Sequence, residues 1–151
     1  MSICLIDTSI FVEILKVPGK CSRHGEIVAA LKGKIEASEK LFLPVATIVE
    51  TGNHIAQSSD GRQRRTCAER FVKQVGLAIS GESPFNPISY DSYAAMGDWL
   101  ANFPDFAMQG VAFADLSIIQ DFERMCRRHP RRPVYIWSLD QHLTGYRHPN
   151  T

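Results

Sequence analysis

The chain has 151 residues, the usual size of one domain, and its 44% hydrophobic and 22% charged residues are typical of a globular protein. With 17 Lys and Arg against 16 Asp and Glu, it has neither a strongly basic nucleic-acid tail nor an acidic disordered tail. No uncharged run approaches the roughly 20 residues that cross a bilayer, and the first ten residues lack the basic segment of a secretory signal. The four cysteines form no CxxC pair, which favours thiols in a reducing compartment. We therefore expect one cytoplasmic domain over residues 1–151, without a membrane partner.

Short apolar strands alternate with helices along the chain. The run ICLI at 3–6 is continuously apolar, as in a strand buried on both faces of a parallel sheet. In chain order, the predicted elements are a strand at 3–6, helices at 10–15 and 26–40, a strand at 41–43, a helix from Pro44 to 56, a loop at 58–65, a helix at 66–79, a loop at 80–87, helices at 91–103 and 111–128, a strand at 133–137 and a short helical remnant after Asp140. This alternation predicts an α/β fold with a short, mostly parallel sheet.

Two of the predicted helices have an apolar stripe that we expect to face the core. The stripe includes Val45 and Val49 in the helix after Pro44, and Leu100 in the helix at 91–103. Aromatic residues near the second helix either pack in the core or a dimer interface, or stack on nucleic-acid bases. They are Tyr90, Tyr93, Trp99 and Phe103.

Acidic residues follow two of the predicted strands. Asp7 comes directly after the strand at 3–6, and Asp140 comes three residues after the strand at 133–137. The carboxyl ends of strands are where open parallel sheets bind ligands. An Asp at such a position also serves as the N-cap of a following helix, so both interpretations stay open for these two residues.

Asp115 has the least ordinary surroundings of the acidic residues. It lies in the middle of the apolar face of the helix at 111–128, where a carboxylate is costly unless it is paired, hydrogen-bonded or bound to a metal. Capping of the first helical turn is the structural alternative. Asp121 and Glu123 lie on the polar flanks of the same helix, and we expect both to be solvated.

Glu50 is less informative by itself. It shares a polar stripe with Thr47 and His54, opposite the apolar face of the helix after Pro44, which indicates a solvated side chain. Several acids at one edge of a sheet repel one another unless a cation lies among them, and hard oxygen ligands select Mg²⁺ or Mn²⁺. Such an ion suits phosphodiester hydrolysis, because it activates water and stabilises the charge that develops on the phosphate.

Four segments at 3–9, 43–50, 114–118 and 138–140 resemble, in this order, the motifs of PIN-domain ribonucleases, and in particular the VapC-type toxins of toxin–antitoxin pairs. The resemblance implies a PIN-like three-layer α/β/α fold. It also implies four acidic ligands of Mg²⁺ or Mn²⁺ that are the catalytic residues, namely Asp7, Glu50, Asp115 and Asp140. Polar support is implied for Thr8, Ser9 and Ser138.

The resemblance further implies a metal-dependent endoribonuclease that is the toxin of a type II toxin–antitoxin pair. RNA as substrate, a cognate antitoxin and a homodimer come from the same resemblance. The sequence departs from the family pattern where Ser138 replaces the commoner Thr, and we expect the closing strand after Asp140 to be short or absent. The helix after Asp115 is bulkier than is usual, with Ile119, Phe122 and Met125.

An arginine-rich run at 124–132 is the most basic segment of the chain. It either contacts RNA phosphates or provides the cations that favour a helix C-terminus. The RNA-binding interpretation assigns these contacts to Arg127, Arg128, Arg131 and Arg132. The basic group at 62–65 is interpreted as a solvated loop.

Two other functions compete with the nuclease. The first is a PIN-like domain without nuclease activity that binds RNA or protein. The second is a different Mg²⁺ enzyme on an α/β sheet, but the Asp-x-Asp of acid-phosphatase-like proteins is absent, because Thr8 and Ser9 follow Asp7. A receiver-like protein would have an Asp where Pro44 follows the second strand.

Overall fold

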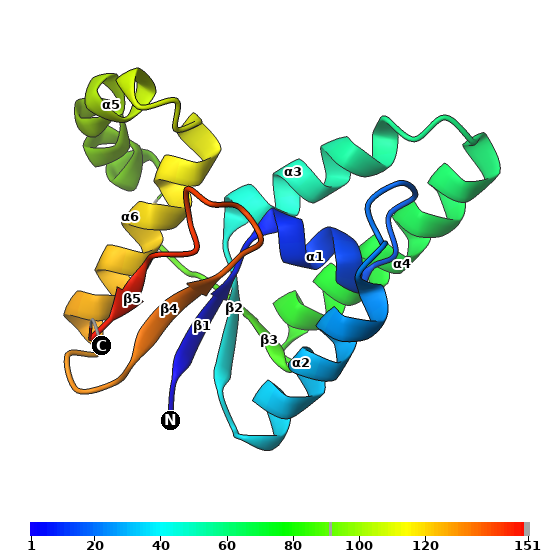
Figure 1. Ribbon diagram of the computed structural model, residues 1–151, viewed down its shortest axis with the longest axis horizontal. Coiled ribbons are helices and arrows are strands. Elements are labelled where there is room, and N and C mark those ends of the chain that lie inside the picture. Colours follow the sequence, from blue (N-terminus) through cyan, green and yellow to red (C-terminus); the bar gives the residue numbers. More distant parts are fainter. Residues whose placement is uncertain (91, 150–151) are drawn as a thin grey trace.

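A five-stranded sheet runs through the centre of the computed structural model, which describes residues 1–90 and 92–149 (Figure 1). The strand order is β3-β2-β1-β4-β5, with β5 antiparallel to β4 and all other neighbours parallel. The strands are β1 (Ile3–Ile6), β2 (Lys40–Leu43), β3 (Phe85–Pro87), β4 (Val134–Trp137) and β5 (Arg147–His148). The helices are α1 (Thr8–Ile14), α2 (His24–Glu36), α3 (Val45–Ala56), α4 (Gly61–Ser80), α5 (Ser92–Met108) and α6 (Phe113–Arg128).

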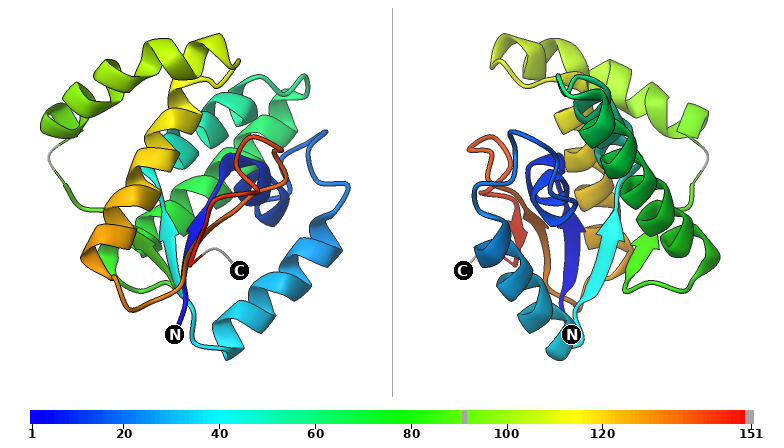
Figure 2. Two further views of the ribbon diagram at one scale, coloured as in Figure 1. Left: turned by 60° about the vertical axis from the view of Figure 1, so that its left-hand side comes forward. Right: turned by 90° about the vertical axis from the view of Figure 1, so that its right-hand side faces the viewer.

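Helices cover both faces of the sheet (Figure 2). On one face, Cys4 and Ile6 of β1 pack with apolar side chains of α1, α2 and α4. On the other face, Ile3 and Leu5 pack with apolar side chains of α6 and β4. The result is the three-layer α/β/α arrangement with a short, mostly parallel sheet, as predicted from the sequence.

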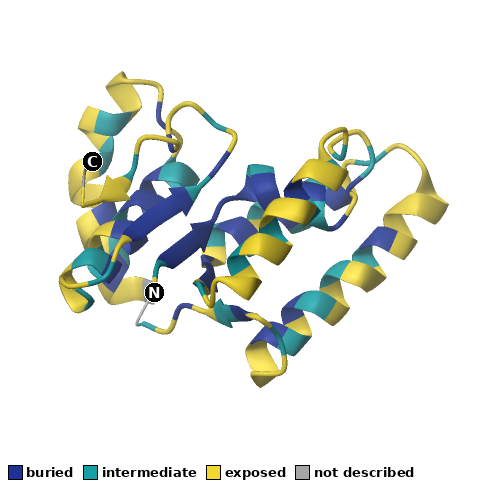
Figure 3. Cartoon of the chain, turned by 60° about the horizontal axis from the view of Figure 1, so that its bottom comes forward, coloured by how far each residue is buried: buried dark blue, intermediate teal, exposed yellow. Residues whose placement is uncertain are grey.

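The central strand β1 is buried on both sides, which explains its continuous apolar sequence. All four of its side chains are fully buried, because it pairs with β2 on one side and with β4 on the other. Figure 3 shows the same pattern for the molecule as a whole: the inner strands are buried, and the helices are exposed on their outer surfaces. Since β1 and β4 run parallel, their carboxyl ends meet at one edge of the sheet.

Several predicted boundaries were wrong, each for a local reason. Helix α4 begins at Gly61 inside the predicted loop, because the Asp60 side chain accepts hydrogen bonds from Arg62 N and Gln63 N at 2.9 and 3.3 Å. Helix α2 ends at Glu36 and not at Lys40, since Ser38 has a φ of 59° that turns the chain into β2. The predicted loop at 80–87 contains β3, an edge strand that accommodates proline at its end.

The helix predicted at 91–103 extends to Met108 and continues through Pro104. Its first predicted residue, Asp91, lies outside the described residues. Its buried side chains include Ala95 and Trp99, whereas Leu100 is 58% exposed, so the predicted core face was wrong at that position. Val45 and Val49 of α3 are exposed as well. The buried face of α3 carries Thr47, Thr51 and Ile55, and Val45 and Val49 lie on the opposite side of the helix.

The C-terminal region after β4 is built from turns and the two-residue strand β5. The closing strand is therefore short, as expected, but the predicted helical remnant after Asp140 is a series of turns. The four cysteines are free thiols, and Cys4 and Cys67 are buried. In the described residues, no helix combines the length and apolar character needed to span a bilayer.

Candidate active site

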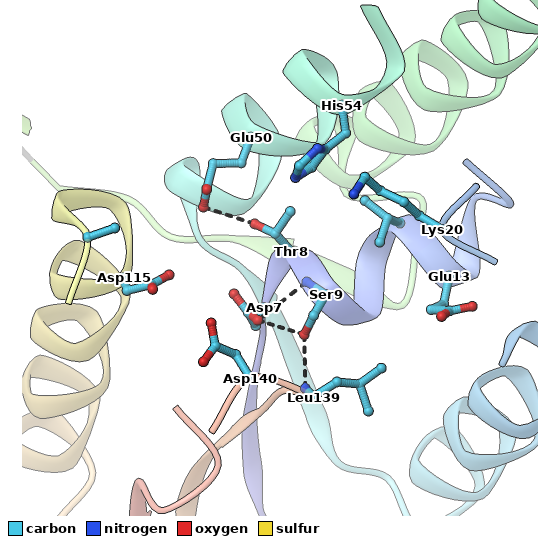
Figure 4. Close-up of a pocket in the computed structure, with 12 residues that line it drawn as sticks. Asp7, Thr8, Ser9, Glu13, Lys20, Glu50, His54, Asp115, Leu139 and Asp140 are labelled. Atoms are coloured by element: carbon cyan, nitrogen blue, oxygen red, sulfur yellow. Dashed lines mark hydrogen bonds between the residues drawn. The ribbon is translucent and has the colours of Figure 1, made fainter. Parts of the chain in front are cut away.

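A pocket of about 380 Å³ opens at the carboxyl ends of β1 and β4. Its walls come from α1, the α1–α2 loop, α3, the start of α6 and the turn after β4. The side chains that line it include all four predicted acidic ligands and the supporting residues Thr8 and Ser9, together with Val12, Glu13, Lys20, His54, Ala112 and Leu139. Figure 4 shows that the carboxylates of Asp7, Glu50, Asp115 and Asp140 point toward a common centre. The fold thus brings together residues that are up to 133 positions apart in the sequence.

Asp7 is held by a network of hydroxyl groups. Its Oδ2 atom accepts hydrogen bonds from Ser9 Oγ and Ser138 Oγ, both at 2.7 Å, and from Ser9 N at 3.3 Å. Ser9 Oγ also accepts the backbone N–H of Leu139 at 2.9 Å, and Ser138 Oγ accepts that of Asp140, also at 2.9 Å. Among the described residues, none donates to the other carboxylate oxygen of Asp7. The residue is therefore both the N-cap of α1 and a buried, oriented group of the pocket.

Glu50 is placed by the N-terminal half of α3. Thr47 is fully buried and donates to the Ile6 carbonyl at 2.7 Å, which fixes α3 against the end of β1. One turn later, Glu50 accepts a hydrogen bond from Thr8 Oγ1 at 3.1 Å. Burial raises the pKa of Glu50, the Thr8 hydrogen bond opposes that rise, and the nearby charges of Asp7 and Asp140 add to it. The polar stripe of α3 thus faces the pocket, and the sequence-based interpretation of Glu50 as a solvated residue was wrong.

Asp115 lies in the first turn of α6, whose N-cap, Ala112, has no side chain that could cap the helix. Burial raises the pKa of Asp115 to about 6, with further contributions from the negative charges of Asp7, Asp140 and Glu50. Asp115 lines the pocket as an acid of the first turn, and among the described residues it accepts no capping hydrogen bond, so the capping interpretation was wrong. Asp140 has two roles: its Oδ1 accepts the backbone N–H of His142 at 2.8 Å, which fixes the turn, and its side chain lines the pocket.

The donor set of the pocket fits a hard divalent cation. Within residues 1–90 and 92–149, no group of three or more His, Cys, Asp and Glu side chains is arranged to hold an ion directly. Mg²⁺, however, keeps several waters and takes one or two protein carboxylates, so direct contact with all four acids is not required. Carboxylates that raise one another's pKa also form a site where a cation is favourable.

Three polar residues of the pocket, Glu13, Lys20 and His54, were not predicted as site residues, and the expected exposure of one buried acid was wrong. Lys20 and Glu13 gave no signal in the sequence, whereas the spacing of His54 four residues after Glu50 indicated a shared helical face. Burial lowers the pKa of His54, and the charge of Lys20 lowers it further. Asp121, expected on a solvated flank, is 2% exposed, because Tyr90 packs over that side of α6.

The arginine-rich run lies at the far end of α6 from Asp115, near the start of β4 (Figure 1). From Asp115 to Arg127, twelve residues of helix span about 18 Å. None of the arginines at 127, 128, 131 and 132 lines the carboxylate pocket. Their assignment to RNA binding stays a prediction.

Known proteins resemble this chain in fold. A search of family models and a search of curated proteins give no match. Among solved structures, FitAcB from Neisseria gonorrhoeae matches with a TM-score of 0.55 and 19% identity, over 91% of this chain and 87% of that chain. The structure of FitAB bound to the IR36 DNA fragment matches with a TM-score of 0.59 and 20% identity, over 93% and 87%. VapBC2 from Rickettsia felis, bound to a DNA fragment from their promoter, matches with a TM-score of 0.53 and 13% identity, over 90% and 99%.

Proposed function

We propose that this chain, which has the PIN-like fold of VapC-type toxins, is a metal-dependent endoribonuclease and the toxin of a type II toxin–antitoxin pair. The observation that carries the proposal is the convergence of four carboxylates, from four separate elements, in one pocket. Acids in such proximity repel one another unless a cation lies among them. A phosphodiester substrate suits the same site, because Mg²⁺ in proteins commonly binds carboxylates together with substrate phosphates.

The residues that would hold Mg²⁺ or Mn²⁺ are Asp7, Glu50, Asp115 and Asp140. When bound, such an ion activates water for attack on phosphorus and stabilises the negative charge that develops there. The hydroxyl groups of the chain contribute orientation. Ser9 and Ser138 fix Oδ2 of Asp7, and Thr8 fixes the carboxylate of Glu50. No Ser, His or Cys nucleophile is required for hydrolysis of this kind.

Cleavage of labelled single-stranded RNA tests the proposal. We expect the wild-type chain to cut RNA with Mg²⁺ or Mn²⁺ and not with a chelator, and Asp115→Asn to lose this activity. Glu123→Gln is the matched control, because it removes one negative charge from an exposed position on the same helix. If Asp115→Asn cuts as fast as the wild type, the carboxylate site is wrong. A folded wild type that binds Mn²⁺ and cuts none of several RNAs would indicate a very narrow target, whereas failure to bind metal at all would favour the binding-module alternative.

A cognate antitoxin and a second copy of the chain are the protein partners that we propose. Apolar side chains are exposed on the helices outside the sheet: Val49 of α3 and Val72 of α4 are 55% and 66% exposed, and Met108 of α5 is 89% exposed. We propose that the partners cover such exposed apolar side chains. Light scattering is expected to give twice the mass of one chain, and Leu100→Glu together with Met108→Glu is expected to give monomers. A wild type that is monomeric at every concentration would contradict the homodimer.

A further inference from the structure

The carboxylate pocket has a basic wall as well as an acidic one. Lys20 and His54 line it, and in Figure 4 the Lys20 side chain points toward the His54 ring on the side of the pocket away from Asp115. Lys20 is exposed and forms no ion pair with any described residue. His54 Nδ1 is buried and has no hydrogen-bond partner in the same part of the chain. The acid on this side, Glu13, already accepts the backbone N–H of Arg23 at 3.1 Å.

A second cavity, of about 420 Å³, is lined by the α1–α2 loop and the first half of α4. Its charged lining residues are Lys16, Arg62 and Arg70, and none of its lining residues is acidic. The same loop lines both cavities, since Lys16 and Cys21 line this one and Lys20 lines the carboxylate pocket. Basic side chains of one short loop are therefore present in both cavities.

The cations of this second cavity differ in what they already bind. Arg70 holds the loop in place, because its guanidinium donates to the carbonyls of Leu15 and Lys16 at 3.0 to 3.2 Å. Lys16 and Arg62 form no ion pair with described residues and are exposed. The two cations that the fold does not use are therefore those that a ligand can contact.

We propose that these two cavities form the path of the sugar–phosphate backbone of single-stranded RNA. Lys20 and His54 contact the phosphate next to the carboxylates, and Lys16 and Arg62 contact phosphates beyond it. This inference rests on the proposed nuclease function. Lys16 and Lys20 are four residues apart, so their Cα atoms are separated by at most about 14 Å. A short single-stranded RNA is therefore long enough to reach both cavities. Because the contacts are to phosphates and not to bases, binding depends strongly on salt and weakly on sequence.

The arginine-rich run is the rival basic surface. It is separated from Asp115 by most of the length of α6, whereas the path through Lys20 begins in the pocket itself. If RNA follows the path, removing positive charge from the path weakens RNA binding and removing it from the arginine-rich run does not. If RNA binds the arginine-rich run, the result is the opposite. The path variant is Lys16→Ala/Lys20→Ala/Arg62→Ala, and the comparison variant, which removes the same charge from the rival surface, is Arg127→Ala/Arg128→Ala/Arg131→Ala.

Fluorescence anisotropy of a labelled single-stranded RNA of about twelve nucleotides, in chelator, measures binding without cleavage. We expect the path variant to raise the Kd roughly 10- to 100-fold and to reduce the slope of log K against log salt by about 2, as loss of three phosphate contacts requires. The comparison variant is expected to stay within about twofold of the wild type. Thermal melts verify that both triple variants fold. If the path variant does not fold, the single substitution Lys20→Glu replaces it in the binding measurement.

Either of two results overturns the proposal: equal weakening by both triple variants, or unchanged RNA affinity in the path variant. A wild type that binds no RNA overturns it too. Cleavage with Mg²⁺, measured in parallel, separates this inference from the nuclease function. RNA that is cut equally well by the wild type and the path variant refutes the path alone. RNA that is bound through the path and never cut refutes the nuclease alone.

Discussion

Neutralising Asp115 is expected to stabilise the metal-free protein. Its pKa rises from an ordinary 3.8 to about 6, first through burial and then through the charges of Asp7, Asp140 and Glu50. A carboxyl whose pKa is higher in the folded chain than in the unfolded chain is destabilising once it is ionised. The cost is absent below pH 4, grows between pH 4 and pH 6, and is complete above pH 6. Asp115→Asn removes it.

The magnitude follows from the same shift. For a fully buried group, a rise in pKa from 3.8 to about 6 corresponds to a loss of about 3 kcal/mol in the free energy of unfolding when the group is ionised. Asp115 is half-buried, so solvent screening reduces the figure to roughly 1.5 kcal/mol. Loss of its favourable interaction with the N-terminus of α6 offsets about 0.5 kcal/mol. A net gain of about 1 kcal/mol raises the Tm by roughly 2–4 °C in a chain of this length.

Thermal melts in chelator at pH 8 and at pH 4 measure this effect. The Tm of Asp115→Asn is expected to exceed that of the wild type at pH 8 and to equal it at pH 4, while Glu123→Gln changes little at either pH. Saturating Mn²⁺ reverses the order, because an ion present at 100 times its Kd adds about 2.7 kcal/mol to the wild type only. An unchanged or lower Tm for Asp115→Asn at pH 8 without metal would refute the idea that burial and the neighbouring acids make the ionised Asp115 carboxylate destabilising.

Three further predictions concern the supports of the site. Thr47→Val keeps the side-chain shape but removes the hydrogen bond to Ile6 O, so urea denaturation is expected to show a loss of about 1–3 kcal/mol; an unchanged midpoint would mean that this bond does not hold α3 in place. Ser138→Ala removes a donor to Asp7, and titration calorimetry is expected to show a 10- to 100-fold weaker Mn²⁺ affinity, which an unchanged Kd would contradict. Burial raises the pKa of Asp121 to about 6, so Asp121→Asn is expected to be more stable than the wild type by up to about 3 kcal/mol above pH 6, with the advantage vanishing below pH 4. A difference that is independent of pH would refute the buried-carboxyl explanation.

The parts of the fold that could be predicted are those in which sequence and burial have a direct relation. The apolar runs of β1 and β4 indicate strands because both faces of these strands are covered. Strand β3 was missed because it forms only by pairing with β2, which is distant in the sequence. The prolines at 84 and 87, considered without that pairing, indicate a loop. The start of α4 depended on recognising Asp60 as its N-cap.

A residue of the candidate site could be predicted only where its neighbours in the sequence make it unusual. Asp115 on an apolar face and Asp7 after a buried strand are unusual without knowledge of the fold. Glu50 is not, because its environment is created by β1 and α1, which are distant in the sequence. Lys20 lies in a loop without regular spacing, so only the structure reveals that it shares a pocket with His54.

The hydrogen bond from Ser138 to Asp7 joins positions 131 residues apart, and this has a consequence in time. A ribosome adds about 5–20 residues per second, so Ser138 is made roughly 7–28 seconds after the chain begins. A nascent chain that has been synthesised through α6 already carries Asp7, Glu50 and Asp115. It lacks Asp140 and the hydroxyl that orients Asp7, and β1 has no β4 beside it. The carboxylate pocket is therefore one of the last parts of the molecule to be completed. During most of the time needed for synthesis, the nascent chain contains no complete site.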